Sequence, residues 1–228
     1  MGKVDISVKE LVEMIERGEL RLPEMQRRYV WRATRVRDLL DSLYRNYPSG
    51  SILVWESEIE QPNREMAVPQ RTNPFSGHKL LLDGQQRLTS LSAVIRGEFV
   101  KVRNRKKPIE ILFNLDHPEN VTEYAEVDSD TDSLSRGEDE LEEFDEAEEG
   151  DQLSIQERMK QMTFVVASRA LAQQPNWVPV TKIFGSDSDT DLLKNAGVNS
   201  FDDPRYEKYS SRLSSRSSYD PHHCWSDD

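Results

Sequence analysis

Gly84 stands between a short apolar run and a segment with helical periodicity, and the residues around it could bind an anion. An apolar run such as residues 80–82, ended by glycine, is typical of a buried strand, and the apolar spacing in residues 88–95 predicts a helix. The free N–H groups of a first helical turn attract anions, as does the positive end of the helix dipole. Arg87 adds a forked donor that can grip two phosphate oxygens. The segment therefore predicts a phosphate site, for which an NTP is the natural ligand.

Asp83 and Gln86 allow a second interpretation of the same segment. A carboxylate at the start of a helix and a glutamine three residues later form a capping box, which satisfies the first N–H groups of the helix without a ligand. Taken alone, a Gly-x-x-Arg pattern at a helix start has low specificity, and the cap is the better interpretation. Two further segments favour the phosphate site.

Residues 22–31 form the first of these segments and combine polar with aromatic side chains. Gln26 and Arg27 offer donors to anions and base edges. Tyr29 and Trp31 alternate as they would in a strand or an extended loop, so both can face one way. On their own, these aromatic residues are interpreted as core packing in preference to recognition.

Residues 47–55 form the second segment, in which a Pro-Ser-Gly turn leads into an apolar strand. In chain order the three segments read Pro-x-x-Gln-Arg-x-Tyr-x-Trp, then Pro-x-Gly-Ser, then Asp-Gly-Gln-Gln-Arg-Leu-Thr. This combination resembles the N-terminal domain of the GmrSD-type modification-dependent restriction endonucleases. The resemblance covers residues 5–115 by motif and continues more loosely to residue 209. Arg28 departs from the pattern, because many members have proline there.

The resemblance implies a ParB/sulfiredoxin-like core in a mixed α+β fold. Members are bacterial anti-phage proteins in which the Asp-Gly-Gln-Gln-Arg motif belongs to an NTP-hydrolysing centre. In longer members a helical region and an HNH-type nuclease domain follow, and nucleotide turnover is coupled to cutting modified or invading DNA. No nuclease site is recognisable in this sequence. The implied function is an NTPase switch whose partners are an NTP, DNA bound directly or through a nuclease, and a protein that supplies the nuclease.

Each motif residue has an expected role in that implied centre. Gly84 lets the backbone approach the phosphates, and Arg87 neutralises the β- and γ-phosphate oxygens. The Asp83 carboxylate would repel a bare triphosphate, so a role for it requires that it bind Mg²⁺ or orient a water. Gln85 or Gln86 positions the attacking water. The expected cofactor is Mg²⁺ carried by an NTP whose base the sequence does not specify. The expected nucleotide-binding residues are Gln26, Arg27, Tyr29, Trp31, Gly84, Arg87 and Thr89.

A dense acidic block dominates the charge of the chain. Residues 123–151 contain fifteen Asp or Glu and one basic residue, Arg136, so their net charge is minus fourteen. The net charge of the whole chain is minus twelve. The rest of the chain is close to neutral, and residues 1–110 are mildly basic, with twenty Lys or Arg against fifteen acids. A like-charge run of this density predicts a disordered linker. Its three candidate uses are a solvating spacer, which we favour, a DNA mimic and a sponge for divalent ions.

Cysteine and histidine do not predict a metal site. The single cysteine, Cys224, excludes an intramolecular disulfide and fits a reducing compartment. His222 and His223 beside it are adjacent residues at a chain end, a poor arrangement for one ion. His78 and His117 are isolated and are expected to be structural or exposed. The sequence has no apolar run long enough for a signal peptide or a membrane span, so we expect a cytoplasmic protein that does not contact a membrane.

Periodicity in the rest of the chain predicts alternating helices and strands. Ser7 and Glu10 form a capping box ahead of an amphipathic helix that ends at Gly18. Residues 57–78 are rich in proline and predict a long excursion that could serve as a lid over the site. The expected helices are 7–18, 36–47 and 162–171, and the expected strands are 51–55, 79–83 and 109–115.

The sequence predicts four regions. Residues 1–120 form the NTP-binding domain, 121–153 the acidic linker, 154–209 a partial helical extension, and 210–228 a disordered tail of a truncated protein. Two alternatives to an NTPase remain, namely a non-catalytic adaptor that binds nucleotide or DNA, supported by the arginines of residues 27–37, and a remnant of a longer restriction protein.

Overall fold

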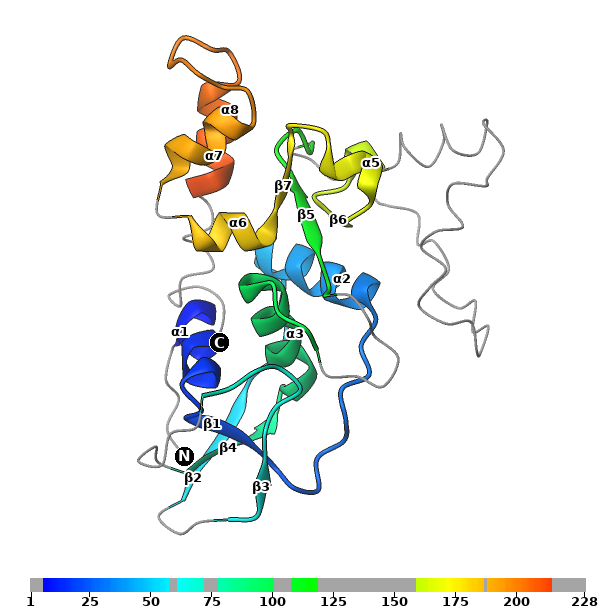
Figure 1. The fold of residues 1–228 in the computed structure, drawn as a ribbon, viewed down its shortest axis with the longest axis vertical. Helices are drawn as coiled ribbons and strands as arrows, with labels where there is room; N and C mark the ends of the chain where they lie inside the picture. The colour runs from blue at the N-terminus through cyan, green and yellow to red at the C-terminus, as the bar shows by residue number, and fades with distance from the viewer. Residues whose placement is uncertain are drawn as a thin grey trace, which may run out of the picture.

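The computed structural model describes residues 6–57, 61–71, 78–100, 108–118, 159–186 and 188–214 and has a mixed α+β fold (Figure 1). In chain order its elements are α1 (Val8–Glu16), β1 (Leu20–Pro23), α2 (Ala33–Tyr44), β2 (Leu53–Ser57), β3 (Asn63–Arg64), β4 (His78–Asp83), α3 (Gln85–Arg96), β5 (Ile111–Asn114), β6 (Phe164–Val166), α5 (Arg169–Ala172), β7 (Trp177–Pro179), α6 (Val180–Gly185), α7 (Asp189–Asn195) and α8 (Tyr206–Ser214). The predicted fold class is confirmed. The acidic block and the residues around Cys224 lie outside the described residues, so the predictions made for them stay open.

The first sheet has the strand order β2-β4-β1-β3. β1 and β4 are parallel, with Leu20 opposite Lys79, whereas β2 pairs antiparallel with β4 and β3 antiparallel with β1. Leu20, Leu22 and Leu81 are fully buried on this sheet. The parallel pairing requires a crossover between β1 and β4, and the long connection that contains α2 and β2 supplies it.

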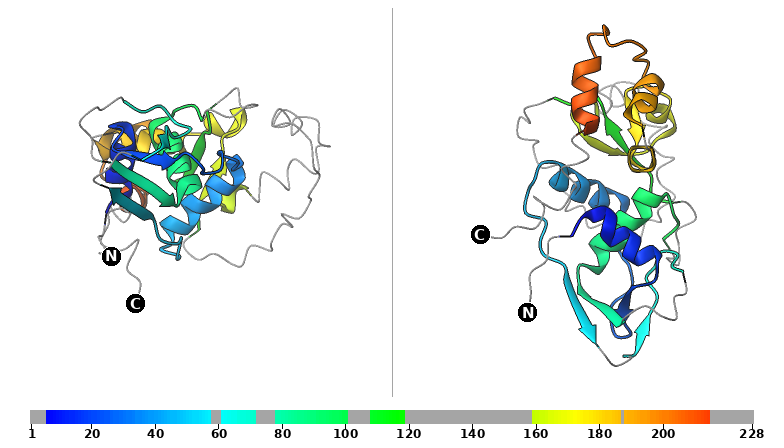
Figure 2. Two further views of the ribbon diagram at one scale, coloured as in Figure 1. Left: turned by 90° about the horizontal axis from the view of Figure 1, so that it is seen from below. Right: turned by 90° about the vertical axis from the view of Figure 1, so that its left-hand side faces the viewer.

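Helices α1, α2 and α3 lie between this sheet and a second, smaller one (Figure 2, right). α1 begins as predicted, because the Ser7 hydroxyl accepts a hydrogen bond from the backbone N–H of Glu10 at 2.9 Å. α2 buries the predicted stripe over residues 36–43 but ends at Tyr44, before Pro48. Tyr47, which periodicity placed in the stripe, is 60% exposed.

The second sheet has the order β6-β5-β7, and both pairings are antiparallel. β5 lies inside the predicted strand 109–115. The predicted helix over residues 162–171 is wrong, because Phe164–Val166 forms β6 and α5 begins only at Arg169. A short apolar run fits a strand or a helix equally well by periodicity, and here pairing with the buried strand β5 decides for the strand.

The polar excursion and the C-terminal segment also differ from expectation. Asn63–Arg64 pairs with β1 as β3, and Met66 and Val68 are buried, so this part of residues 57–78 belongs to the packed structure. A lid role stays a prediction. The segment 154–209, predicted to be helical, contains β6 and β7 as well as helices, and α8 continues beyond residue 209 to Ser214. The domain boundaries themselves stay predictions.

A single hydrophobic cluster joins both sheets, running from α1 residues such as Val8 to Leu213 of α8. Tyr44 at the end of α2 makes edge-to-face contacts with Phe113 and Phe164 of the second sheet, at centroid distances of 5.4 and 5.8 Å. In the part of the chain that the structure describes, no helix has the length and apolar character needed to cross a membrane.

Candidate functional site

The turn from β4 into α3 has the strand-glycine-helix geometry that the sequence predicts. Gly84 caps α3 with φ +91°, a left-handed conformation that favours glycine. A Cβ at this position would lie 2.3 Å from Cδ1 of Ile52, so space also requires glycine. No side chain caps the helix, and its first turn contains no acidic residue. The capping-box interpretation of Asp83 and Gln86 is therefore wrong, and the helix N-terminus retains N–H groups for another acceptor.

Arg87 joins the motif helix to the turn before β2. Its Nη1 donates to the carbonyl oxygen of Ser49 at 2.5 Å, and Nη2 donates to Ser51 at 2.7 Å and to Oδ2 of Asp83 at 2.9 Å. Gly50 lies between the two carbonyls with φ +82°, and a Cβ there would meet Nη1 at 2.6 Å. The Arg87 side chain is 15% exposed, whereas that of Asp83 is 72% exposed. Arg87 therefore fixes the turn, and its contact with phosphate stays a prediction.

Gln86 is buried and fully engaged with the segment that precedes α2. Its Oε1 accepts the N–H of Val30 at 2.9 Å, and its Nε2 donates to the carbonyl oxygen of Arg28 at 3.1 Å. Gln86 is 5% exposed. Gln86, one of the two glutamines expected to position water, therefore connects the motif helix to residues 28–30.

Gln85 differs from its neighbour. It is 6% exposed, and its Oε1 has no hydrogen-bond partner among the described residues. The hydroxyls of Thr89 and Ser92, four and seven residues further along the helix, are likewise buried without a partner. Buried polar atoms are nearly always hydrogen-bonded, so three such oxygens on one helical face are unusual. Of the two motif glutamines, Gln85 is therefore the one whose side-chain oxygen has no partner among the described residues.

The structure brings Gln26 and Arg27 to the carboxyl end of β4. Gln26 Nε2 donates to the carbonyl oxygen of Leu82 at 2.8 Å, one residue before Asp83. Arg64, in β3, donates to the carbonyl oxygens of Gln26 and Arg27. The side chain of Arg27 is exposed. The expected residues of two distant segments therefore meet at one edge of the sheet.

The two expected stacking residues have different environments. Tyr29 is 3% exposed and belongs to the hydrophobic core, and its hydroxyl lies 2.8 Å from Oγ of Ser90. The packing alternative therefore fits Tyr29. Trp31 is half-buried, and the guanidinium carbon of Arg35 lies 5.2 Å from its ring centroid. Stacking of a base on either ring stays a prediction.

No contact with the motif was predicted from the sequence for four supporting residues. Ser49 and Ser51 act through backbone carbonyls, which any residue type supplies. Ser90 donates to the carbonyl oxygen of Gln86 at 2.7 Å, and Arg64 lies in a segment that seemed irregular. Only the fold shows that these residues contact the motif.

Among the described residues, no group of three or more His, Cys, Asp or Glu side chains could hold a metal ion. Mg²⁺ bound with a nucleotide has a lower requirement, because phosphates and water supply most of its ligands and one protein carboxylate suffices. The exposed Asp83 fits that requirement.

His117 is structural, one of the two outcomes expected. It is 6% exposed, lies 3.0 Å from the Tyr44 hydroxyl through Nε2, and its Nδ1 faces the carbonyl oxygen of Pro118 at 2.9 Å. Burial is the largest cause that lowers the pKa of its imidazole to about 4, and the nearby cations contribute to the same shift. His117 is therefore neutral at neutral pH.

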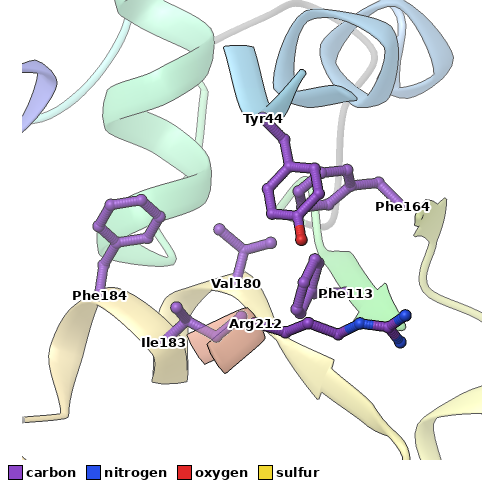
Figure 3. Close-up of a pocket in the computed structure, with 7 residues that line it drawn as sticks. All are labelled: Tyr44, Phe113, Phe164, Val180, Ile183, Phe184 and Arg212. Carbon is purple, nitrogen blue, oxygen red and sulfur yellow. The ribbon is translucent and has the colours of Figure 1, made fainter. Parts of the chain in front are cut away.

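A small pocket lies apart from the motif, between α2, the second sheet, α6 and α8 (Figure 3). Its lining is apolar and aromatic except for Arg212, whose guanidinium donates to the carbonyl oxygen of Leu115. The lining residues are Tyr44, Phe113, Phe164, Val180, Ile183, Phe184 and Arg212. None of the expected site residues lines it, so it is no part of the candidate nucleotide site.

Comparison with known proteins identifies a family and a relative. The sequence model of the GmrSD restriction endonuclease N-terminal domain matches residues 8–202. An uncharacterized protein of Methanocaldococcus jannaschii is 31% identical over 134 residues, which make up 56% of this chain and 22% of that protein. The chain thus matches less than a quarter of the length of this relative.

Proposed function

The chain belongs to the GmrSD restriction endonuclease N-terminal domain family, and from this membership we propose that it is an NTP-binding and NTP-hydrolysing regulatory module of a modification-dependent, anti-phage restriction system. The observation that carries the proposal is the uncapped N-terminus of α3, reached through Gly84 and flanked by Asp83, Arg87, Gln26 and Arg27.

The proposed centre binds phosphate through backbone and cationic groups. The free N–H groups of the first turn of α3 donate hydrogen bonds to the phosphate oxygens, and the helix dipole favours the negative charge of the phosphate. Arg87 is held at that turn by Ser49 and Ser51, so its charge is already in place when a nucleotide binds. The exposed Arg27 adds a second cation.

Gln85 orients the attacking water in this proposal, because its Oε1 is uncommitted, whereas Gln86 is occupied with residues 28–30. Asp83 is the residue that would hold Mg²⁺, which would neutralise part of the phosphate charge. The comparison of four NTPs described next identifies which base is preferred.

The test is phosphate release from ATP, GTP, CTP and UTP with Mg²⁺, measured for the native chain and for Arg87→Ala, Gln85→Ala and Arg71→Ala. Arg71 is an exposed arginine paired with Glu16 and serves as the matched control. We expect the native chain to hydrolyse at least one NTP and the control to have the same rate. The rate of the Arg87 variant should fall at least about 100-fold, which is on the order of the effect of losing one contact to the transition state.

Arg87→Ala also frees the turn at residues 49–51, so its thermal unfolding must be measured in parallel. Gln85→Ala removes a side-chain oxygen without a partner and tests the chemistry without that complication. If the native chain unfolds cooperatively and turns over no NTP, the NTPase proposal is rejected and the non-catalytic adaptor takes its place.

A further inference from the structure

The connection between β1 and α2, which Figure 1 shows as a loop, carries the densest positive charge in the described part of the sequence. Residues 24–37 contain five arginines and one acid, Glu24. Arg28 and Arg32 are both exposed. Within the described residues, no carboxylate pairs with either of them, whereas Arg37 pairs with Asp38.

This connection is fixed in place although residues 27–32 form neither helix nor strand. Gln86 holds its backbone at Val30 and Arg28, and Arg64 holds it at Gln26 and Arg27. The buried ring of Tyr29 anchors it further through Ser90. Because these hydrogen bonds fix the backbone of the loop, less conformational entropy is lost when its exposed side chains bind a partner.

Burial alternates along the connection. Tyr29 is 3% exposed and Trp31 is half-buried, so both side chains face inward. Val30, which lies between them, is 63% exposed. Arg28 and Arg32 are exposed on the same outer side as Val30. In an extended chain, residues four apart are separated by about 13 Å. That separation is close to the roughly 12 Å width of the major groove of B-DNA.

We propose that this arginine loop, residues 27–32, binds duplex DNA, with Arg28 and Arg32 on phosphates at the two sides of a groove and Val30 facing the groove between them. The first turn of α2 begins directly after Arg32 and has neither an acidic residue nor a side-chain cap, so its N–H groups add to the phosphate contacts. The proposal goes beyond nucleotide turnover and does not depend on it.

The test is fluorescence anisotropy of a labelled 20-base-pair duplex with the full chain, titrated between 50 and 200 mM salt. The loop variant is Arg28→Ala with Arg32→Ala. The matched control is Arg169→Ala with Lys182→Ala, which removes the same charge from exposed positions on α5 and α6. We expect the loop variant to bind about tenfold more weakly at low salt and to lose about 1.8 from the salt slope, while the control stays within about twofold.

Three results would overturn the proposal: equal losses in loop and control variants, native binding by the loop variant, or equal competition by polyglutamate of the same charge. Arg28→Lys with Arg32→Lys should retain most of the salt slope, which separates a charge effect from misfolding. Phosphate release measured on the same samples distinguishes the two proposals, because neither arginine belongs to the proposed nucleotide centre. Loop-dependent DNA binding without turnover would reject the NTPase and leave this surface intact.

Discussion

The buried amide of Gln86 ties the motif helix to residues 28–30 with two hydrogen bonds. We expect Gln86→Ala to lower the free energy of unfolding by about 2 kcal/mol, because it leaves the Val30 N–H and the Arg28 carbonyl without their partner. Gln85→Ala is the matched control, since the Oε1 it removes has no partner. Urea unfolding should therefore show a large loss at position 86 and a loss below about 1 kcal/mol at position 85. Equal losses would contradict the separate roles of the two glutamines.

His117 makes stability depend on pH. Its neutral imidazole donates from Nδ1 to Pro118 and accepts the Tyr44 hydroxyl at Nε2, and burial lowers its pKa from 6.5 to about 4. The unfolded chain therefore binds a proton that the folded chain does not bind between these two values, so stability falls as pH drops from 6.5 to about 4. The full loss is on the order of 3 kcal/mol.

Urea unfolding across that pH range tests this prediction, with His117→Asn as the control. Asparagine cannot take up a proton, so the variant should lack this part of the acid sensitivity, whatever its stability at neutral pH. A native chain and a variant with parallel pH profiles would show that His117 contributes nothing to the effect.

The β4–α3 turn was predictable because its determinants are local. An apolar run, one glycine and a helical stripe lie within residues 80–95, and the structure has the expected strand, turn and helix. The backbone partners of Gln86 and Arg87 lie 36 to 58 residues away in sequence, so these hydrogen bonds could not be predicted from periodicity. The predicted capping box failed for a local reason, because the Asp83 carboxylate contacts Arg87, four residues further along the chain. Pairing with β5, equally non-local, decided that residues 164–166 form a strand.

Gly84→Ala tests the turn as an element. The left-handed backbone of φ +91° disfavours alanine by about 1–2 kcal/mol, and the new Cβ would meet Ile52 at 2.3 Å. We expect a loss of about 2 kcal/mol or more in thermal unfolding. In the Ile52→Ala background the glycine substitution should cost less, because the steric part is removed and the backbone part remains. An equal cost in both backgrounds would exclude the contact with Ile52 as a cause.

At the scale of the whole molecule, the structure predicts that the acidic block can be removed. The chain leaves the described structure after Pro118 and re-enters at Met159, and the Asn114 side chain donates to the carbonyl oxygens of Lys160 and Met162, at 2.8 and 3.1 Å. The two ends of the segment are therefore held near each other by β5 and its surroundings, so a short linker can join them.

Replacing residues 121–156 with an eight-residue Gly-Ser linker changes the net charge from minus twelve to plus two. Because loop closure becomes less costly as the loop shortens, we expect stability to rise by about 1 kcal/mol, with cooperative thermal unfolding at physiological salt. This outcome is what the spacer interpretation requires. A marked loss of stability or of cooperativity would show that the acidic block makes contacts that support the fold. A control of native length, with its acids replaced by Ser, Asn and Gln, separates the effect of charge from that of loop length.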